Sequence, residues 1–120
     1  MVASHDLQVF KAEFFKALAH PVRIRLLEVL RHGERSVQEL QGALVLDQST
    51  VSQQLAVLRA KHVVVARKEG TTVRYAVRDG RVGTLLDTAR AIFNAQLTGS
   101  QTMLRALQRE SRRPPRRRAQ

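Results

Sequence analysis

Residues 47–65, DQSTVSQQLAVLRAKHVVV, place a cluster of uncharged hydrogen-bonding side chains on a helix-forming sequence. Val51, Leu55 and Leu58 recur at i, i+4 and i+7, which is the spacing of the buried stripe of an amphipathic helix. The first two turns also carry six polar residues, namely Gln48, Ser49, Thr50, Ser52, Gln53 and Gln54. Glutamine can pair with adenine N6 and N7 in the major groove of DNA, and a hydroxyl can meet a donor or an acceptor. The stretch therefore predicts a helix whose exposed face reads base edges.

Gln53 and Gln54 are the side chains that we expect to contact bases. The hydroxyls of this helix are expected to be divided between bases and phosphates, and they belong to Ser49, Thr50 and Ser52. Free backbone N–H groups and the positive end of the dipole at this N-terminal turn also favour an anion. Arg59, further along, is expected to neutralise the DNA backbone. The alternative reading is that the polar residues are ordinary capping and solvated side chains.

Two helices are predicted at the start of the chain. The first is expected to begin at Asp6 as its N-cap and carries apolar residues at helical spacing, namely Leu7, Phe10, Phe14 and Leu18. His20-Pro21 interrupts it, because the residue before a proline avoids the α region and proline suits the first helical position. The second helix is expected from Pro21 to about His32, with a core face formed by Leu26, Leu27 and Leu30.

A third, short helix is predicted before the polar stretch. Ser36 followed three residues later by Glu39 is a capping-box pattern that opens the helix VQELQGAL. The polar helix then follows over residues 47–61. Two helices joined by a tight turn are thus expected.

Residues 63–77, VVVARKEGTTVRYAV, predict a β-hairpin. Their β-branched residues alternate in part and bracket a glycine-containing loop over residues 69–72. The hairpin residues that we expect to contact phosphates or a minor groove are Arg67, Lys68, Thr71, Thr72 and Arg74. Such contacts strengthen binding without adding much sequence information.

A long helix is expected after Asp79-Gly80. Its wide apolar face consists of Val82, Leu85, Leu86, Ala89, Ile92, Phe93 and Leu97. Gly99-Ser100 is expected to break or bend it before a last turn or two. The order of these elements predicts a mainly α fold with a small β-hairpin, a winged helix-turn-helix whose second helix lies in the major groove.

The two ends of this domain carry apolar residues that a monomer would leave partly exposed. They are Leu7, Phe10 and Phe14 from the first helix and Leu85, Leu86, Ala89, Ile92 and Phe93 from the last. A contiguous apolar patch usually marks an interface, so a homodimer formed by the N- and C-terminal helices is expected. Two-fold symmetry would place half-sites roughly 10 base pairs, or a multiple, apart. The alternative is that the long helix packs only on its own domain.

The charge of the chain also favours a polyanionic partner. It has 120 residues, enough for one domain, and a net charge of +11. Residues 111–120, SRRPPRRRAQ, are predicted to form a disordered basic tail that follows a folded domain over residues 1–110. Removing the five arginines of the tail from +11 leaves +6 on the folded part. The alternative is that the basic composition serves only solubility.

Several classes of protein are disfavoured by composition. The chain has no cysteine, which excludes disulfides and thiolate metal sites. No apolar run approaches the roughly 20 residues of a membrane span, and the N-terminus lacks the apolar segment of a signal peptide, so a cytoplasmic protein is expected. An enzyme is not expected, because no nucleophile, base and orienting group are set to converge and no glycine-rich phosphate loop is present.

Four segments together resemble the ArsR/SmtB family of bacterial transcriptional repressors. They are FFKALAHPVRIRLLEVL, SVQEL, STVSQQLAVLRAKHVV and ARKEGTTVRYAV, and the resemblance covers roughly residues 10–93. The resemblance implies a homodimer paired through its first and last helices, which binds imperfect palindromes and represses until an effector binds. It also implies a recognition helix over Asp47 to Lys61 and a wing around Glu69 to Thr72.

The chain departs from this family at the sensor positions. Many members hold a metal through a cysteine pair in the helix that matches residues 36–44, where this chain has SVQELQGAL. Others use aspartate and histidine pairs on the last helix, but no histidine follows Arg81 and Asp87 is the lone carboxylate before Glu110. No cofactor is therefore predicted, although a metal ion at another position is possible.

The four histidines are candidate metal ligands, because neutral imidazole commonly binds metal ions. A capping or packing role is expected for His20 and a dipole-related role at a helix end for His32, while His62 is expected to be structural or to face a phosphate. His5 and Asp6 are the remaining candidates for a metal site, completed by another subunit.

The sequence therefore predicts a sequence-specific regulator of transcription that binds double-stranded DNA, a repressor acting as a homodimer on a palindromic operator. The first alternative is a winged-helix module that binds another protein. The second is an RNA-binding protein, which the arginine tail would suit but which lacks stacking aromatic residues in the wing apart from Tyr75.

Overall fold

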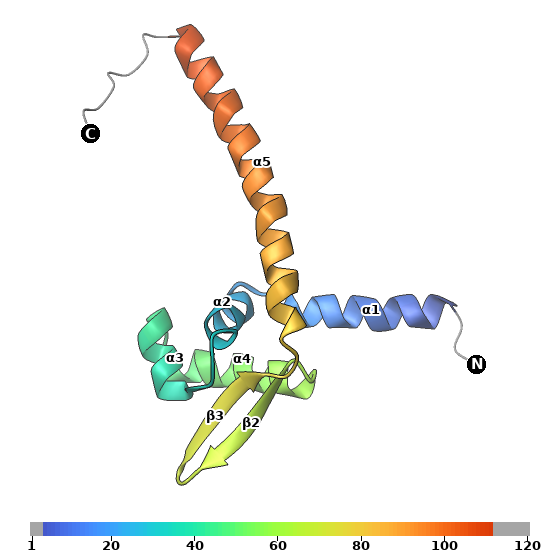
Figure 1. Ribbon diagram of the computed structural model, residues 1–120, viewed down its shortest axis with the longest axis vertical. Helices are drawn as coiled ribbons and strands as arrows, with labels where there is room; N and C mark the ends of the chain where they lie inside the picture. The colour runs from blue at the N-terminus through green and yellow to red at the C-terminus, as the bar shows by residue number, and fades with distance from the viewer. Residues whose placement is uncertain (1–3, 112–120) are drawn as a thin grey trace. The chain divides into compact units, whose positions relative to one another are not determined.

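The structure is a computed structural model that describes residues 4–111 (Figure 1). Its elements are α1 (Ser4–Leu18), α2 (Pro21–Leu30), β1 (Arg35–Ser36), α3 (Val37–Leu44), α4 (Gln48–Ala60), β2 (Val64–Glu69), β3 (Thr72–Val77) and α5 (Arg81–Ser111). The chain divides into two units after Thr84. The first holds α1 to the first residues of α5, and the second consists of the rest of α5.

The start of α1 differs from the prediction, whereas the start of α2 confirms it. Helix α1 begins at Ser4, so Asp6 lies within the first turn, where its charge complements the helix dipole, and is not the N-cap. His20 is the N-cap of α2, with extended backbone and with Nδ1 accepting a hydrogen bond from the backbone N–H of Val22 at 3.1 Å. The expected capping role of His20 is confirmed. Helix α2 ends at Leu30, slightly before the expected end.

The predicted capping box of α3 is present in both directions. Ser36 Oγ accepts a hydrogen bond from the backbone N–H of Glu39 at 3.2 Å, and Glu39 Oε1 accepts one from the backbone N–H of Ser36 at 2.9 Å. Asp47 is the N-cap of α4 but makes no side-chain capping hydrogen bond. Helices α3 and α4 thus form the expected helix-turn-helix pair.

The hairpin is also confirmed, with a tighter loop than expected. Its strands are joined by Gly70 and Thr71, and Gly70 has a positive φ of 64°, which glycine adopts without steric cost. The two-residue strand β1 adds to β3, so the sheet has the antiparallel order β1-β3-β2. Strand β1 was not predicted because two residues are too few to show an alternating pattern.

The core of the first unit is built from aliphatic side chains. The residues predicted on α2 and α4 are all buried, together with partners from the neighbouring elements; the full core is Ala17, Leu18, Leu26, Leu27, Leu30, Leu40, Leu44, Val51, Leu55, Leu58, Val63, Val64 and Val82. Helix α4 contacts α1, α2, α3 and β2. Its position is therefore fixed by packing against these elements, and the exposed residues Ser49 and Gln53 mark the face that stays free.

Helix α5 is continuous from Arg81 to Ser111, so the break expected at Gly99-Ser100 is wrong. One glycine inside a helix costs only about 1 kcal/mol relative to alanine, which the many good helix formers around it offset. Thr102 Oγ1 donates to the carbonyl oxygen of Thr98 at 2.9 Å across this point. The helix reaches the boundary predicted for the basic tail, and residues 112–120 of that tail lie outside the described residues.

Candidate nucleic-acid interface

The exposed face of α4 carries part of the predicted reading surface. Val51, Leu55 and Leu58 point into the core, so residues half a turn away point outward. Ser49 and Gln53, four residues apart, are both exposed and share this outer face. Of the other polar residues, Gln48 is also exposed, whereas Thr50, Ser52 and Gln54 are partly buried at its edges.

Gln54 is held by a contact that the sequence did not reveal. Arg23 Nε of α2 donates to Gln54 Oε1 at 2.8 Å. Arg23 Nη1 also donates to the carbonyl oxygens of Lys16 and Ala17, each at 3.2 Å, at the end of α1. The guanidinium thus joins α1, α2 and α4. Because its oxygen is engaged, Gln54 is less suited to bases than Gln53.

A second arginine of α2 supports α3. Arg25 Nη2 donates to the carbonyl oxygen of Leu44 at 2.7 Å. The last carbonyls of a helix lack intrahelical partners and carry the negative end of the dipole, so a guanidinium stabilises them. Arg23 and Arg25 therefore act on the C-termini of two different helices. The sequence signal for this is weak, since it consists only of two arginines near a helix start.

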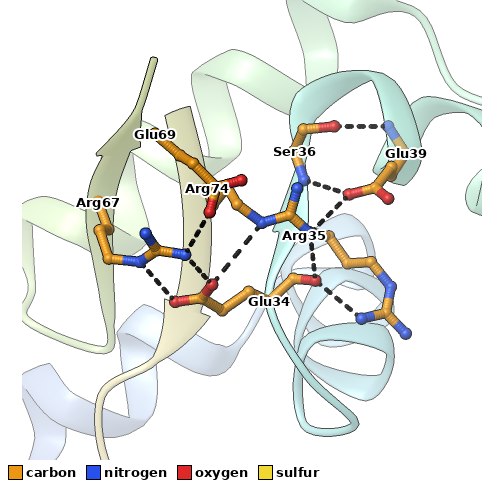
Figure 2. Close-up of polar contacts among 7 residues, drawn as sticks. All are labelled: Glu34, Arg35, Ser36, Glu39, Arg67, Glu69 and Arg74. Carbon is orange, nitrogen blue, oxygen red and sulfur yellow. Dashed lines mark hydrogen bonds and ion pairs between the residues drawn. The ribbon is translucent and has the colours of Figure 1, made fainter. Parts of the chain in front are cut away.

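The hairpin of β2 and β3 forms the wing. An ion-pair network joins it to the helix-turn-helix, as Figure 2 shows. Glu34, just before β1, accepts hydrogen bonds from Arg67 of β2 through both carboxylate oxygens, at 2.6 Å to Nη2 and 3.2 Å to Nε. Arg67 Nη2 also donates to Glu69 at 3.1 Å. Arg67 and Arg74 are direct cross-strand partners, an arrangement of like charges that is unfavourable by itself. Glu34 offsets this repulsion.

Arg74 connects the same network to α3. Its Nη2 donates to Glu39 Oε1 at 3.2 Å and to the carbonyl oxygen of Glu34 at 3.3 Å, and its Nε lies 3.7 Å from Glu34 Oε1. Its side chain is only 24% exposed, against 51% for Arg67. Glu39 is also the acceptor of the capping box at Ser36. The N-terminus of α3 and the wing thus share one carboxylate.

The carboxylates of Glu34 and Glu39 are charged near neutral pH. The hydrogen bond from Arg67 is the main cause that lowers the pKa of Glu34 below its usual value. For Glu39, the hydrogen bond from the backbone N–H of Ser36 is the main cause of a lowered pKa, with a further contribution from the charge of Arg74. Hydrogen bonds to Glu34 and then Glu69 raise the pKa of Arg67. Glu34 and Glu39 therefore form ion pairs, and not neutral hydrogen bonds, with Arg67 and Arg74.

The remaining predicted wing residues lie outside this network. Lys68 is exposed and makes no ion pair within residues 4–111, and Thr71 and Thr72 are exposed at the hairpin tip. Arg59 is exposed in the last turn of α4. These side chains are free to meet phosphates, whereas the charges of Arg67 and Arg74 are already compensated.

The candidate metal ligands do not come together in the part of the chain that the structure describes. Within residues 4–111, no three histidine, cysteine, aspartate or glutamate side chains gather in a way that could hold a metal ion. His5 and Asp6 are exposed in the first turn of α1. His62 follows α4 in a left-handed conformation with φ of 61°, and its Nδ1 lies 3.5 Å from Arg78 Nη1.

Helix α1 leaves its aromatic side chains uncovered. Of its described side chains, only Ala17 and Leu18 are buried, while Phe10 is 74% exposed and Phe14 39%. A groove of about 570 Å³ runs between these phenylalanines and the end of α4, and it is lined by Phe10, Lys11, Glu13, Phe14, Phe15, Ala60, Lys61 and His62. None of the helices between residues 4 and 111 has the length and hydropathy to cross a membrane.

The helix-turn-helix, the polar outer face of α4 and the adjoining wing together define a winged-helix protein that binds DNA. The sequence profile of the bacterial regulatory protein, arsR family, matches residues 20–64. The HTH-type transcriptional regulator Rv0081 of Mycobacterium tuberculosis is 44% identical over 105 residues, which span 87% of this chain and 92% of that relative. The chain belongs to the arsR family of bacterial regulatory proteins. It is a DNA-binding regulator of transcription and not an enzyme.

Further similar proteins support the assignment to this family. The crystal structure of Rv0081 superimposes with a TM-score of 0.71, covering 78% of this chain and 95% of that chain. The solution structure of the homodimeric winged helix-turn-helix DNA-binding domain of Mb0332 from Mycobacterium bovis gives a TM-score of 0.68 at 31% identity, over 76% of this chain and 84% of that one. The biofilm growth-associated repressor of Agrobacterium fabrum is 40% identical over 84 residues, 70% of this chain and 72% of that repressor. The alternative of a protein- or RNA-binding module has no support here.

Proposed function

We propose that this regulator is a homodimeric repressor that occludes a promoter by binding a palindromic operator. The observation that carries the proposal is the outward position of Ser49 and Gln53 on α4, a helix fixed by packing on α2, α3 and β2. A rigid helix that presents a glutamine can make two hydrogen bonds to an adenine edge. We therefore assign base reading to Gln53, and backbone contacts to Ser49, Arg59 and Lys68.

The dimer is proposed to form through α1 and α5. Phe10 and Phe14 of α1 are exposed, and on α5 Ile92 and Phe93 are 54% and 56% exposed. Leu7 of α1 is 48% exposed, whereas Leu85, Leu86 and Ala89 are partly buried. Apolar surface of this extent on a monomer usually marks an interface. The homodimeric state of the Mycobacterium bovis domain supports the same assembly for this chain.

Repression is proposed because a dimer that covers a promoter palindrome excludes other proteins from it. The name of the Agrobacterium fabrum relative, a repressor, supports this direction of regulation. Because the partner is chromosomal DNA, we place the protein in the cytoplasm. A metal effector, if one acts, would use ligands other than the cysteine pair and the last-helix histidines of the family pattern, such as His5 and Asp6.

The proposal is tested by titrating the purified protein against its own upstream DNA and against a scrambled duplex at about 150 mM salt, a concentration at which non-specific attraction is screened. We expect selective binding of the upstream duplex. Equal affinity for both duplexes would refute sequence-specific repression. Repeating the titration with Zn²⁺ or Ni²⁺ shows whether a metal changes the affinity.

The assembly is tested by sedimentation of the wild type and of Phe93→Asp. We expect a dimer for the wild type and a monomer for the variant, because an aspartate in an apolar interface is left without a partner. Arg109→Asp, a change at an exposed polar position of the same helix, is the control and should leave the dimer intact. A wild type that sediments as a monomer at micromolar concentration would contradict the proposal.

A further inference from the structure

The ion pairs of the wing reduce the positive charge that the wing can offer to DNA. Arg67 and Arg74 were expected to neutralise phosphates. Instead, both carboxylate oxygens of Glu34 accept hydrogen bonds from Arg67, and Arg74 is three-quarters covered between Glu34 and Glu39. With Arg35 and Glu69, the group in Figure 2 contains three guanidinium groups and three carboxylates. It therefore presents no net charge to DNA.

We propose that Glu34 limits the sequence-independent part of DNA affinity by keeping Arg67 paired when the protein is bound. The wing then meets phosphates through Lys68 and its uncharged tip, and not through Arg67. This inference rests on the proposed contact of α4 and the wing with duplex DNA. It makes Glu34 a positioning residue, since it acts on DNA only through Arg67 and Arg74.

An exchange of partners on binding is unfavourable for an electrostatic reason. If Arg67 left Glu34 for a phosphate, the Glu34 carboxylate would lose both hydrogen bonds from Arg67 and would keep only Arg74, whose Nε lies 3.7 Å away. That carboxylate, now less compensated, would lie close to the negatively charged DNA backbone. The exchange thus gains one contact with a phosphate, but it loses two hydrogen bonds and creates one repulsion. Retaining the bidentate pair avoids both.

The same contacts fix where the wing lies. Glu39 accepts hydrogen bonds from the backbone N–H of Ser36, at the start of α3, and from Arg74 of β3. Glu34 joins the segment before β1 to β2. The wing is therefore tied to the first helix of the helix-turn-helix, and its uncharged tip is placed relative to α4 by residues that need not touch DNA.

The test is the salt dependence of binding to a scrambled duplex, since each neutralised phosphate steepens the plot of log K against log[salt] by about 0.9. Four full-length proteins are compared: the wild type, Glu34→Gln, the double variant Glu34→Gln/Arg67→Gln, and Glu110→Gln. Glutamine keeps a hydrogen-bond acceptor at position 34 but removes its charge. The double variant has the net charge of the wild type. Glu110→Gln makes the same change of charge at the end of α5, outside the network.

We expect Glu34→Gln to steepen the slope by about 0.9 for each wing in contact, because Arg67 then keeps only the single ion pair with Glu69 and can turn to a phosphate. The double variant should return to the wild-type slope, and Glu110→Gln should leave the slope unchanged. If Arg67 already neutralises a phosphate in the wild type, Glu34→Gln will keep the wild-type slope and the double variant will be flatter by about 0.9 per wing. That result overturns the proposal, as does an equal steepening by Glu110→Gln.

The variant Lys68→Gln distinguishes a failure of this proposal from a failure of the proposed function. It should flatten the slope by about 0.9 per wing if the wing lies on DNA. A Glu34→Gln slope equal to that of the wild type refutes the role of Glu34 in either case. If Lys68→Gln also has no effect, the refutation extends to the contact of the wing with DNA. Sequence preference for the upstream duplex is measured separately and is not affected by these outcomes.

Discussion

Arg23 Nε donates to Gln54 Oε1 at 2.8 Å, so a side chain of α2 holds a glutamine of the recognition helix α4. The same guanidinium donates to two carbonyl oxygens at the end of α1. The two adjacent glutamines of α4 therefore have different roles. Gln53 is exposed and can reach a base, whereas Gln54 fixes α4 against its neighbours.

This division predicts different effects for two matched variants. Gln53→Ala should lose discrimination at one operator position, at a cost of about 1–3 kcal/mol, because the hydrogen bonds to that base are lost. Gln54→Ala should retain discrimination but lower the free energy of unfolding by about 1–3 kcal/mol, since a partly buried guanidinium loses an acceptor. Binding to single-base operator variants and urea unfolding measure the two effects. The opposite pattern would reverse the assignment.

The turn between α3 and α4 contains a position where substitution should stabilise the protein. Val45 is 87% exposed and has φ of 56° and ψ of 54°, the left-handed region that a β-branched side chain rarely adopts. Because asparagine tolerates this region, Val45→Asn should raise the free energy of unfolding by about 1 kcal/mol. Val65→Asn is the control, an exposed valine in an ordinary strand, and it should not stabilise. A lower stability of Val45→Asn would contradict the strain argument.

The capping box at α3 predicts a loss of stability on removal of one hydroxyl. Ser36→Ala should lower the free energy of unfolding by about 1 kcal/mol, because the backbone N–H of Glu39 loses its acceptor. Ser36→Thr keeps the hydroxyl and should retain most of the stability. Chemical denaturation of the three proteins compares them. Equal stability of Ser36→Ala and the wild type would show that the box contributes nothing.

The start of α5 predicts a dependence of stability on pH. Hydrogen bonds from the side chain and then the backbone of Arg81 lower the pKa of Asp79 to about 2. A lowered folded-state pKa stabilises the folded state above the unfolded-state pKa of about 4, and the contribution is lost as pH falls toward 2. Asp79→Asn should therefore melt below the wild type at pH 7 and at pH 5.

Between about pH 4 and pH 2 the two melting temperatures should converge, because protonation removes the charge of Asp79 in the wild type. The difference in melting temperature across this range is the measurement. Glu110→Gln, which removes an exposed carboxylate at the other end of α5, is the control for the change of charge. A constant difference from pH 7 to pH 2 would show that the charge of Asp79 is not responsible.

Much of the fold is determined by local sequence. Pro21 after His20, the pair Ser36 and Glu39, and the spacing of Val51, Leu55 and Leu58 each specify a helix boundary or a buried face through interactions within a few residues. These predictions are confirmed because capping and helical periodicity depend little on the rest of the chain. The expected break at Gly99 failed because one glycine is a weak local signal, which a long helix can tolerate.

The tertiary structure decided which polar side chains are available. In the sequence, Gln53 and Gln54 are equivalent, and Arg67, Lys68 and Arg74 form one basic group. Contacts across more than 30 positions separate them: Arg23 engages Gln54, and Glu34 engages Arg67 and Arg74. Composition and periodicity determined that the chain would form a basic winged helix with a polar recognition helix. Partners brought together by packing decided which charged side chains are paired within the protein, because an ion pair depends on distance in space and not on position along the chain.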